Sequence, residues 1–442
     1  MQAWLEMTAA DLGRGIGAGE IDPVALAQTY LDAIDAHDLK DRIYARVTPE
    51  RALAEAQAAA ARAASGQRLS PLDGVPISWK DLFDTAGVVT EAGSKLLEGR
   101  IPDADARVLS NATAAGLVCL GKTHMSELAF SGLGYNPNTG TPPCVNDAEA
   151  VPGGSSSGAA ASVAFGLAAA GIGSDTGGSV RIPSAWNDLV GLKTTSGRLS
   201  LEGVVPLALK FDTVGPLCRS VEDVALLLAV MEGSPAPDLS GASLQGKRFA
   251  VLKTIALDDL RDEPMEAFQQ ALLKFTTAGA SVEHIEIPEI GTAMDHASCL
   301  YTSEAYGLWR DVIEANPQAM YSEVLERFRL GKTYSGPDYV AAWAALDAVR
   351  AAYHRATCAY DAVLLPTAAI LPPKLERLNT DHDYYVRENL LTLRNTRIGN
   401  LMGGCALTLP TGVPSCGVMM MAPPDSEAAL LRLGAAAEAA LA

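Results

Sequence analysis

The sequence of 442 residues is 48% hydrophobic and only 19% charged, so it can bury a large core and is not typical of a disordered chain. It holds 52 acidic against 34 basic residues, a formal net charge of −18, and has no run rich in Lys or Arg. Because phosphate backbones repel such a chain, we expect no nucleic-acid partner.

The sequence carries no sign of secretion, membrane insertion or metal binding. No charged-then-apolar leader opens it, and the longest apolar run, residues 159–173, is shorter than the roughly 20 residues that span a bilayer. Its seven cysteines and six histidines lack paired spacing. We therefore expect a cytoplasmic protein with no membrane contact, free thiols, no metal and no cofactor.

Hydrophobic periodicity and turn residues predict the elements in chain order. A helical lead-in over residues 1–70 is followed by a short apolar strand over 75–80, which ends at Lys80. Further helices are expected at 105–115, 159–170, 264–279, 297–330, 390–401 and 425–442. Further strands are expected at 117–120, 247–253, within 359–371 and at 406–409.

Helix and strand alternate along much of the chain, which predicts an α/β fold. The Pro-rich break at 235–238 is interpreted as a loop inside a domain, because strand-like sequence resumes soon after it. We expect one domain over residues 1–442, with a motif-rich core at 72–221 and a variable, substrate-side region at 235–400.

Residues 116–123 match the phosphate-loop pattern GxxxxGK[ST]. A phosphate loop needs a strand before its first glycine and a helix that begins at its lysine. Here a predicted helix precedes Gly116, and residues 117–120 are themselves strand-like. We therefore interpret the segment as helix, strand and turn rather than as a nucleotide site.

Residues 154–158 match GxSxG, the nucleophile elbow, which would make Ser156 a nucleophile with a histidine further along the chain. The histidines available for that role are His284, His296, His354 and His382. Residues 147–152 do not form the strand that an elbow requires. A Gly/Ser loop that turns the chain is the preferred interpretation of this segment alone.

A lysine and two serines in glycine-rich loops form a third pattern. A serine hydroxyl must lose its proton to a base, and a lysine can be that base only when uncharged, a state that burial favours. Lys80 has apolar neighbours, Ser155 lies in a Gly/Ser loop, and glycines before Ser179 leave backbone N–H groups open to an oxyanion. For Lys80 alone, an ordinary lysine at a strand end is the simpler interpretation.

Together these segments resemble the amidase signature family, the Ser/cis-Ser/Lys hydrolases. The resemblance is strongest over residues 72–221 and follows the family's order in the segments 72–81, 121–129, 152–158, 175–183 and 190–193. It implies a large α/β/α sandwich around a twisted mixed β-sheet. It also implies amide hydrolysis through an acyl-enzyme, without metal or cofactor.

The resemblance implies a role for each residue of the pattern. Ser179 would be the nucleophile, and Ser155, preceded by a cis peptide bond after Gly154, would relay its proton to Lys80. The oxyanion hole would be formed by the backbone N–H groups of Thr176, Gly177, Gly178 and Ser179. Asp175 and Arg181 flank the nucleophile, where they either orient its loop through charge-assisted hydrogen bonds or form a plain salt bridge.

Residues 187–188 depart from the family pattern with no consequence that the sequence shows, and two further departures lie in loops expected to face the substrate. His124 and Cys144 stand where we look for asparagines. We expect His124 and Cys144 to affect which substrate binds rather than how its bond is cleaved. We interpret His124 as a surface or pocket-wall histidine, with a third catalytic base as the alternative.

The substrate is the least determined part of the prediction. Met125, Phe130, Tyr301 and Tyr306 are expected to give the acyl pocket an apolar, aromatic wall, although helix-core positions explain the two tyrosines equally well. Arg310 is the basic residue expected near this pocket. We therefore expect hydrolysis of a C–N bond in a small neutral amide or carbamate, in preference to dicarboxylate half-amides and glutamine.

A second function remains open on the same resemblance. The chain could be the glutamine-hydrolysing A-type subunit of an amidotransferase, which acts with partner subunits on aminoacyl-tRNA. A non-enzymatic binding module is disfavoured, because Lys80, Ser155 and Ser179 occur together. Neither function fixes the oligomeric state, and a homodimer is compatible with the hydrolase.

Overall fold

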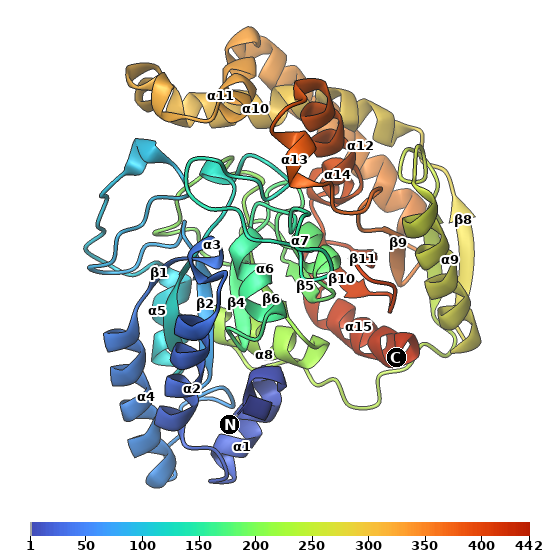
Figure 1. Ribbon diagram of the computed structural model, residues 1–442. Coiled ribbons are helices and arrows are strands. Elements are labelled where there is room, and N and C mark those ends of the chain that lie inside the picture. Colours follow the sequence, from blue (N-terminus) through green and yellow to red (C-terminus); the bar gives the residue numbers. More distant parts are fainter. Residues whose placement is uncertain (1) are drawn as a thin grey trace.

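Short apolar runs between helical segments form the strands of one mixed sheet of eleven strands in the computed structural model, which describes residues 2–442 (Figure 1). In the order in which they lie side by side, the strands are β1 (Tyr44–Val47), β3 (Val118–Thr123), β2 (Pro76–Lys80), β4 (Ala170–Ser174), β6 (Val214–Cys218), β5 (Val190–Lys193), β10 (Cys405–Pro410), β11 (Gly417–Ala422), β9 (Ala362–Pro366), β7 (Arg248–Leu252) and β8 (Ser281–Ile285).

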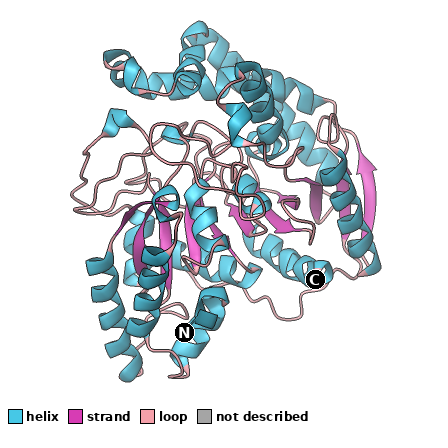
Figure 2. Cartoon of the chain, viewed as in Figure 1, coloured by secondary structure: helices cyan, strands magenta, loops and turns pink. Residues whose placement is uncertain are grey.

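Helices lie on both sides of this sheet, as Figure 2 shows. In chain order they are α1 (Ala9–Gly17), α2 (Pro23–Ala36), α3 (Lys40–Ile43), α4 (Pro49–Ala64), α5 (Arg107–Ala114), α6 (Ser157–Ala164), α7 (Arg181–Trp186), α8 (Val221–Glu232), α9 (Asp262–Thr277), α10 (Glu289–Ala315), α11 (Ser322–Arg329), α12 (Gly336–Thr357), α13 (Leu375–Leu378), α14 (His382–Met402) and α15 (Glu427–Leu441). The predicted α/β fold, a mixed sheet between helical layers, is confirmed.

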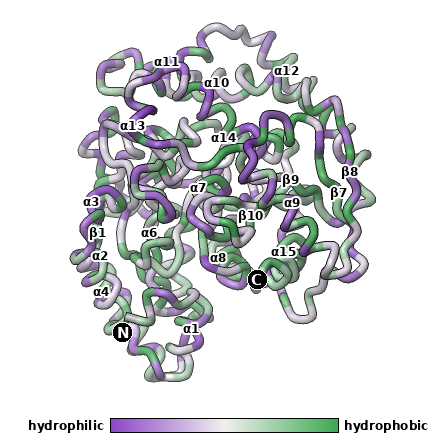
Figure 3. The backbone as a smooth tube through the Cα atoms, turned by 45° about the vertical axis from the view of Figure 1, so that its right-hand side comes forward, coloured by the Kyte–Doolittle hydropathy of each residue, from purple (hydrophilic) through white to green (hydrophobic). Residues whose placement is uncertain are grey.

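The core lies between the sheet and the helices that cover it. Most strand residues are fully buried, and the helices turn their apolar sides toward the sheet. Hydrophilic residues mark outer helices such as α11 (Figure 3). No helix in the described part of the chain is long and apolar enough to span a bilayer.

The strand β4 is the clearest departure from the predicted elements. The helix expected over 159–170 ends at Ala164, and the glycine-rich segment after it, interpreted as a loop, is a strand in the centre of the sheet. Its glycines allow close packing, because a Cβ on Gly171 would lie 2.7 Å from the carbonyl oxygen of Ala159 on α6. Glycine has no side chain, which permits this contact but also removes the apolar residues by which a strand is predicted from sequence.

Other boundaries differ less. The strand predicted to end at Lys80 does so as β2, and the closing helix is α15. The helical stretch expected over 297–330 is divided by Pro317 into α10 and α11, since proline has no N–H for a helix interior. The helix α12 was not predicted.

The fold places two loops beside the carboxyl ends of neighbouring strands in the sheet. Strands β2 and β4 are parallel neighbours, so Lys80 and Ser174 end side by side. The loops that lead into α6 and α7 lie beside these carboxyl ends, which is where α/β proteins bind ligands. Helices α10 to α14 lie above these loops in Figure 1, and α10 packs against both α12 and α14.

Candidate active site

Lys80 is fully buried at the end of β2. Its Nζ lies 2.7 Å from Ser155 Oγ and 2.8 Å from Ser174 Oγ, within hydrogen-bonding distance of both hydroxyls. Burial lowers the pKa of this lysine from 10.5 to about 7, although the charges of Asp175 and Asp212 oppose the shift. A large share of Lys80 is therefore uncharged at neutral pH, as a general base must be.

The loop of Ser155 brings its hydroxyl to this lysine and its backbone to the loop of Ser179. The peptide bond between Gly154 and Ser155 is cis, as the resemblance implies. The next residue, Ser156, donates its backbone N–H to the carbonyl oxygen of Ser179 at 3.2 Å. Among the hydrogen bonds of residues 2–442, none joins the hydroxyls of Ser155 and Ser179; such contacts are often long in free enzymes and tighten with substrate.

An ion pair organises the loop that carries Ser179. Asp175 and Arg181 are both fully buried, and Arg181 Nη2 lies 2.9 Å from Asp175 Oδ1. The carboxylate also accepts the backbone N–H groups of Gly178 at 2.9 Å and Val180 at 3.2 Å. Burial opposes the charge of Asp175, but the charge and hydrogen bonds of Arg181 outweigh it and hold the pKa of that carboxyl below its usual value. The pair thus fixes the backbone on either side of Ser179.

The backbone N–H groups of this loop differ in what they bind. In the described part of the chain, those of Thr176, Gly177 and Ser179 have no acceptor within the protein, so they are free to bind an oxyanion. The N–H of Gly178, also expected in the oxyanion hole, donates to Asp175 in this structure. Gly178 is still needed at this point, because its φ is +140° and a Cβ there would lie 2.1 Å from Thr396 Oγ1.

Two residues of the site were not predicted from the sequence. Ser174 offers Lys80 a second hydroxyl, and its position at the end of a glycine-rich strand concealed it. Asp212 accepts the hydroxyl of Thr176 at 2.5 Å and the N–H of Leu207 at 2.9 Å, and burial raises its pKa. It follows a loop whose sequence shows no motif.

A small cavity of about 30 Å³ adjoins Ser179. Phe130 and Tyr301, expected in the acyl pocket, lie on its wall. Met125 and Tyr306 do not. Met125 is buried against Gly93 in the core, and Tyr306 lies on α10 with its hydroxyl donated to Glu314 at 3.2 Å.

The cavity wall also carries two arginines that were not predicted. Arg327 reaches it from α11 and Arg397 from α14. The basic residue expected near the pocket, Arg310, is not on this wall. Arg310 lies at the surface, where its side chain is 63% exposed and pairs with the neighbouring Asp311.

The two competing motifs have structural roles. Residues 118–123 form strand β3, which follows helix α5, as the pattern predicts. Lys122 is buried, with its Nζ 2.7 Å from the carbonyl oxygen of Phe83 and 3.3 Å from Asp81 Oδ1. Ser156, the serine of GxSxG, follows no strand, and its hydroxyl donates to the carbonyl oxygen of Ser174 at 3.2 Å.

The two departures expected to face the substrate, His124 and Cys144, contact backbone atoms. The ring of His124 lies 3.2 Å from the carbonyl oxygen of Asp41, and burial lowers its pKa to about 4. The thiol of Cys144 is buried and donates to the carbonyl oxygen of Trp186. Within residues 2–442, no three His, Cys, Asp or Glu side chains come together as metal ligands would.

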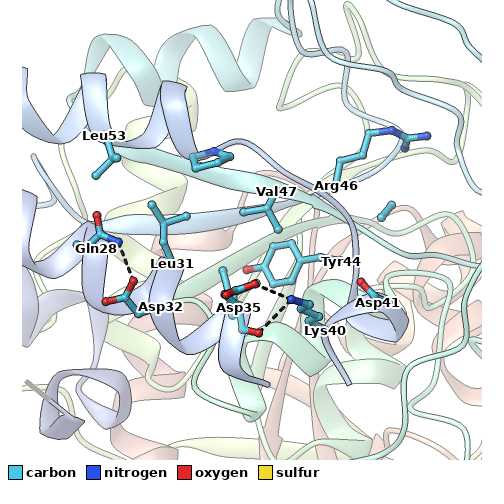
Figure 4. Close-up of a pocket in the computed structure, with 13 residues that line it drawn as sticks. Gln28, Leu31, Asp32, Asp35, Lys40, Asp41, Tyr44, Arg46, Val47 and Leu53 are labelled. Carbon is cyan, nitrogen blue, oxygen red and sulfur yellow. Dashed lines mark hydrogen bonds and ion pairs between the residues drawn. The ribbon is translucent and has the colours of Figure 1, made fainter. Parts of the chain in front are cut away.

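Larger hollows lie away from these residues. One of about 450 Å³ opens between α2 and β1, and Figure 4 shows the ion pair of Lys40 and Asp35 beside it. Its lining includes none of the lysine, serines and backbone donors described above. The small cavity, in contrast, is lined by Ser179 and Gly177, so it is the candidate site for a substrate.

Comparisons with known proteins identify relatives of this chain. A family model described as Amidase matches residues 25–431. The chain is 35% identical over 434 residues to the 2-amino-5-chloromuconic acid deaminase of Comamonas testosteroni, covering 95% of this chain and 93% of the relative. It is 34% identical over 469 residues to the A-type subunit of the glutamyl-tRNA(Gln) amidotransferase from Anaeromyxobacter sp. (strain K), covering 97% of this chain and 95% of the relative.

A solved structure has the same fold. It is described as an amidase, aligns with a TM-score of 0.89 at 31% sequence identity, and covers 99% of this chain and 100% of that one. Since the family model and these relatives extend over nearly the whole sequence, the chain belongs to the amidase signature family.

Proposed function

We propose that this protein hydrolyses the C–N bond of a small-molecule amide or carbamate through an acyl-enzyme on Ser179. The observation that carries the proposal is the contact of Lys80 Nζ with Ser155 Oγ at 2.7 Å, in a site that lowers the pKa of the lysine to about 7. Such a pKa lets one group accept and return a proton near neutral pH.

In the first half of the reaction, Ser179 Oγ attacks the carbonyl carbon of the substrate. The proton of Ser179 passes to Ser155 Oγ, and the proton of Ser155 passes to Lys80 Nζ. The free N–H groups of Thr176, Gly177 and Ser179 bind the negative oxygen of the tetrahedral intermediate. When the C–N bond breaks, the proton returns from Lys80 through Ser155 to the leaving nitrogen, which departs as ammonia or an amine.

In the second half, water attacks the acyl group on Ser179. Lys80, uncharged again, takes the proton of this water through Ser155. The ester bond breaks, Ser179 recovers its proton, and the acid leaves. Ser174 also contacts Lys80 Nζ, and this second hydroxyl keeps the amine in place during both transfers.

Covalent labelling tests the identity of the nucleophile. A fluorophosphonate should react with Ser179, because this hydroxyl lies beside free backbone donors that bind the phosphoryl oxygen. Mass spectrometry of the labelled peptides measures the outcome. A label on Ser156 with Ser179 unmodified would replace the proposal with the nucleophile-elbow mechanism.

The second candidate function is glutamine hydrolysis within an amidotransferase. The observation that favours it is the 34% identity to the A-type subunit of an amidotransferase over almost the full length of both chains. Gel filtration of the protein alone, with a measurement of ammonia released from glutamine, separates the two. A protein that hydrolyses small amides without partner subunits supports the amidase, and one that is active only on glutamine with partners supports the amidotransferase.

A further inference from the structure

The cavity beside Ser179 contains an unusual concentration of positive charge. Its lining consists of Ala129, Phe130, Ser131, Gly177, Ser179, Tyr301, Arg327, Leu393 and Arg397. Two of these residues are cationic and none is acidic. The protein as a whole has the opposite balance, with a formal net charge of −18.

Neither arginine has an acidic partner among residues 2–442. Arg327 donates to the carbonyl oxygen of Phe130 at 3.1 Å, and its guanidinium lies 4.4 Å from the centre of the Phe130 ring. Arg397 has no hydrogen bond or ion pair within this part of the chain. Other buried arginines are satisfied within the protein: Arg181 by Asp175, and Arg394 by the backbone oxygens of Asp258 and Ala256.

The two arginines share one cavity wall, and the charge of Arg397 disfavours that of Arg327. Burial, together with the charge of Arg397, lowers the pKa of Arg327 to about 10. Burial also lowers the pKa of Arg397. A pair of neighbouring, partly desolvated cations is costly unless an anion joins them. In the free protein, the wall with Arg327 and Arg397 therefore favours the binding of an anion.

A third donor faces the same cavity. The hydroxyl of Tyr301 is buried, and within residues 2–442 it has no hydrogen-bond partner. Buried polar groups are normally satisfied, so an orphan on a cavity wall indicates an absent ligand. The two guanidiniums can only donate hydrogen bonds and the hydroxyl can donate one, which suits a carboxylate, an acceptor with two oxygens.

On the basis of the proposed function, we propose that the acyl part of the substrate carries a carboxylate, bound between Arg327 and Arg397 with a hydrogen bond from Tyr301. The substrate class is the half-amide of a short dicarboxylic acid. Hydrolysis then consumes one water, breaks the C–N bond, and yields the dicarboxylate and ammonia. This reverses the expectation of a neutral acyl group, which rested on the aromatic wall and on the lack of an arginine that the sequence could place at the pocket.

The cavity also limits which carboxylates fit. Its volume of about 30 Å³ suits a carboxylate on a short spacer, as in malonamate or succinamate. Glutamine carries an ammonium group beside its carboxylate, and that group would face two arginines with no acidic residue in the lining to receive it. We therefore expect the half-amides to be better substrates than glutamine.

Ammonia release from matched pairs of amides tests the proposal. Malonamate and succinamate are compared with malonamide and succinamide, which differ by one charged group. We expect kcat/KM to be higher for each half-amide by roughly 10²-fold, the effect of a buried charge pair. Arg397→Met should remove this preference, with roughly 10²-fold lower kcat/KM for the half-amides and little change for the diamides. Arg397→Lys should restore part of it.

Arg397 is a sharper target than Arg327, which also packs on Phe130. A structural arginine would lower the melting temperature when replaced, whereas Arg397→Met removes a cation from an unpaired cluster and should leave the melting temperature unchanged or raise it. Arg387→Met is the matched control, since Arg387 lies on the same helix with a side chain that is 57% exposed. It should behave as the wild type.

The outcomes separate this inference from the proposed function. If Ser179 takes the fluorophosphonate label and the diamides are the better substrates, or Arg397→Met lowers both classes equally, the carboxylate site is wrong and the amidase stands. If Ser179 is not labelled and no amide is cleaved, the proposed function fails. Calorimetry of malonate binding to the wild type and to Arg397→Met then decides the anion site, because loss of binding in the variant supports it and equal or absent binding in both overturns it.

Discussion

Ser179→Ala should lower kcat/KM for the best amide substrate on the order of 10⁶-fold, the loss seen when a serine hydrolase loses its nucleophile. Removal of one hydroxyl oxygen leaves the ion pair of Asp175 and Arg181 intact, so the loop should keep its shape. Circular dichroism and the melting temperature should therefore match the wild type. Steady-state ammonia release at neutral pH measures the loss.

The matched control for this variant is Ser156→Ala. Ser156 is the competing serine, but its hydroxyl donates to the carbonyl oxygen of Ser174 and supports the backbone at the end of β4. The variant should lose some stability and keep its activity within about tenfold, because it leaves Lys80 and Ser155 in place. Loss of activity in Ser156→Ala, with Ser179→Ala still active, would contradict the assignment of the nucleophile.

The part of the fold that carries the chemistry could be predicted from the sequence because its signals are local. An apolar run ending at Lys80 is a strand for reasons contained in that run. The strand β4 could not be predicted in the same way. A Cβ on Gly171 would collide with α6, and one on Gly173 with the side chain of Ser156 just before that helix. These contacts join separate segments, so the local sequence pattern does not report them.

The same distinction between local motifs and tertiary contacts applies to the residues of the site. Lys80, Ser155 and Ser179 lie in short motifs whose order is visible in one sequence, and the resemblance supplied their expected roles. The engagement of the Gly178 N–H by Asp175 depends on the folded loop, so four expected oxyanion donors become three free ones.

The arginines of the cavity had no signal in the sequence. Arg327 and Arg397 lie on two different helices that also carry other charged residues. In the sequence they therefore look like ordinary solvent-facing arginines of a helix. Only the tertiary structure turns both toward Ser179. Arg310, the basic residue that the sequence places near the pocket tyrosines, is exposed to solvent instead.

The activity of the wild type should rise with pH until Lys80 has lost its proton. Burial lowers the pKa of Lys80 to about 7, and only the uncharged amine can take the proton of Ser155. Below pH 7, kcat/KM should therefore increase about tenfold per pH unit, and it should level off above pH 7. A half-amide substrate stays ionised through this range, because carboxylic acids titrate near pH 4. Rates measured from pH 5 to 10 give the profile.

Lys80→Met should lower kcat/KM by roughly 10²-fold to 10⁴-fold, the usual contribution of a general base, and should flatten this profile. Methionine has a similar length, so it fills the buried space and removes only the amine. Lys193→Met is the matched control. Lys193 is also fully buried with a pKa lowered to about 8, but its Nζ donates to the carbonyl oxygens of Thr194 and Gly404 rather than to a serine. Its variant should be less stable yet keep the rise centred near pH 7. A Lys80→Met protein that is folded by circular dichroism and retains that rise would show that another group is the base.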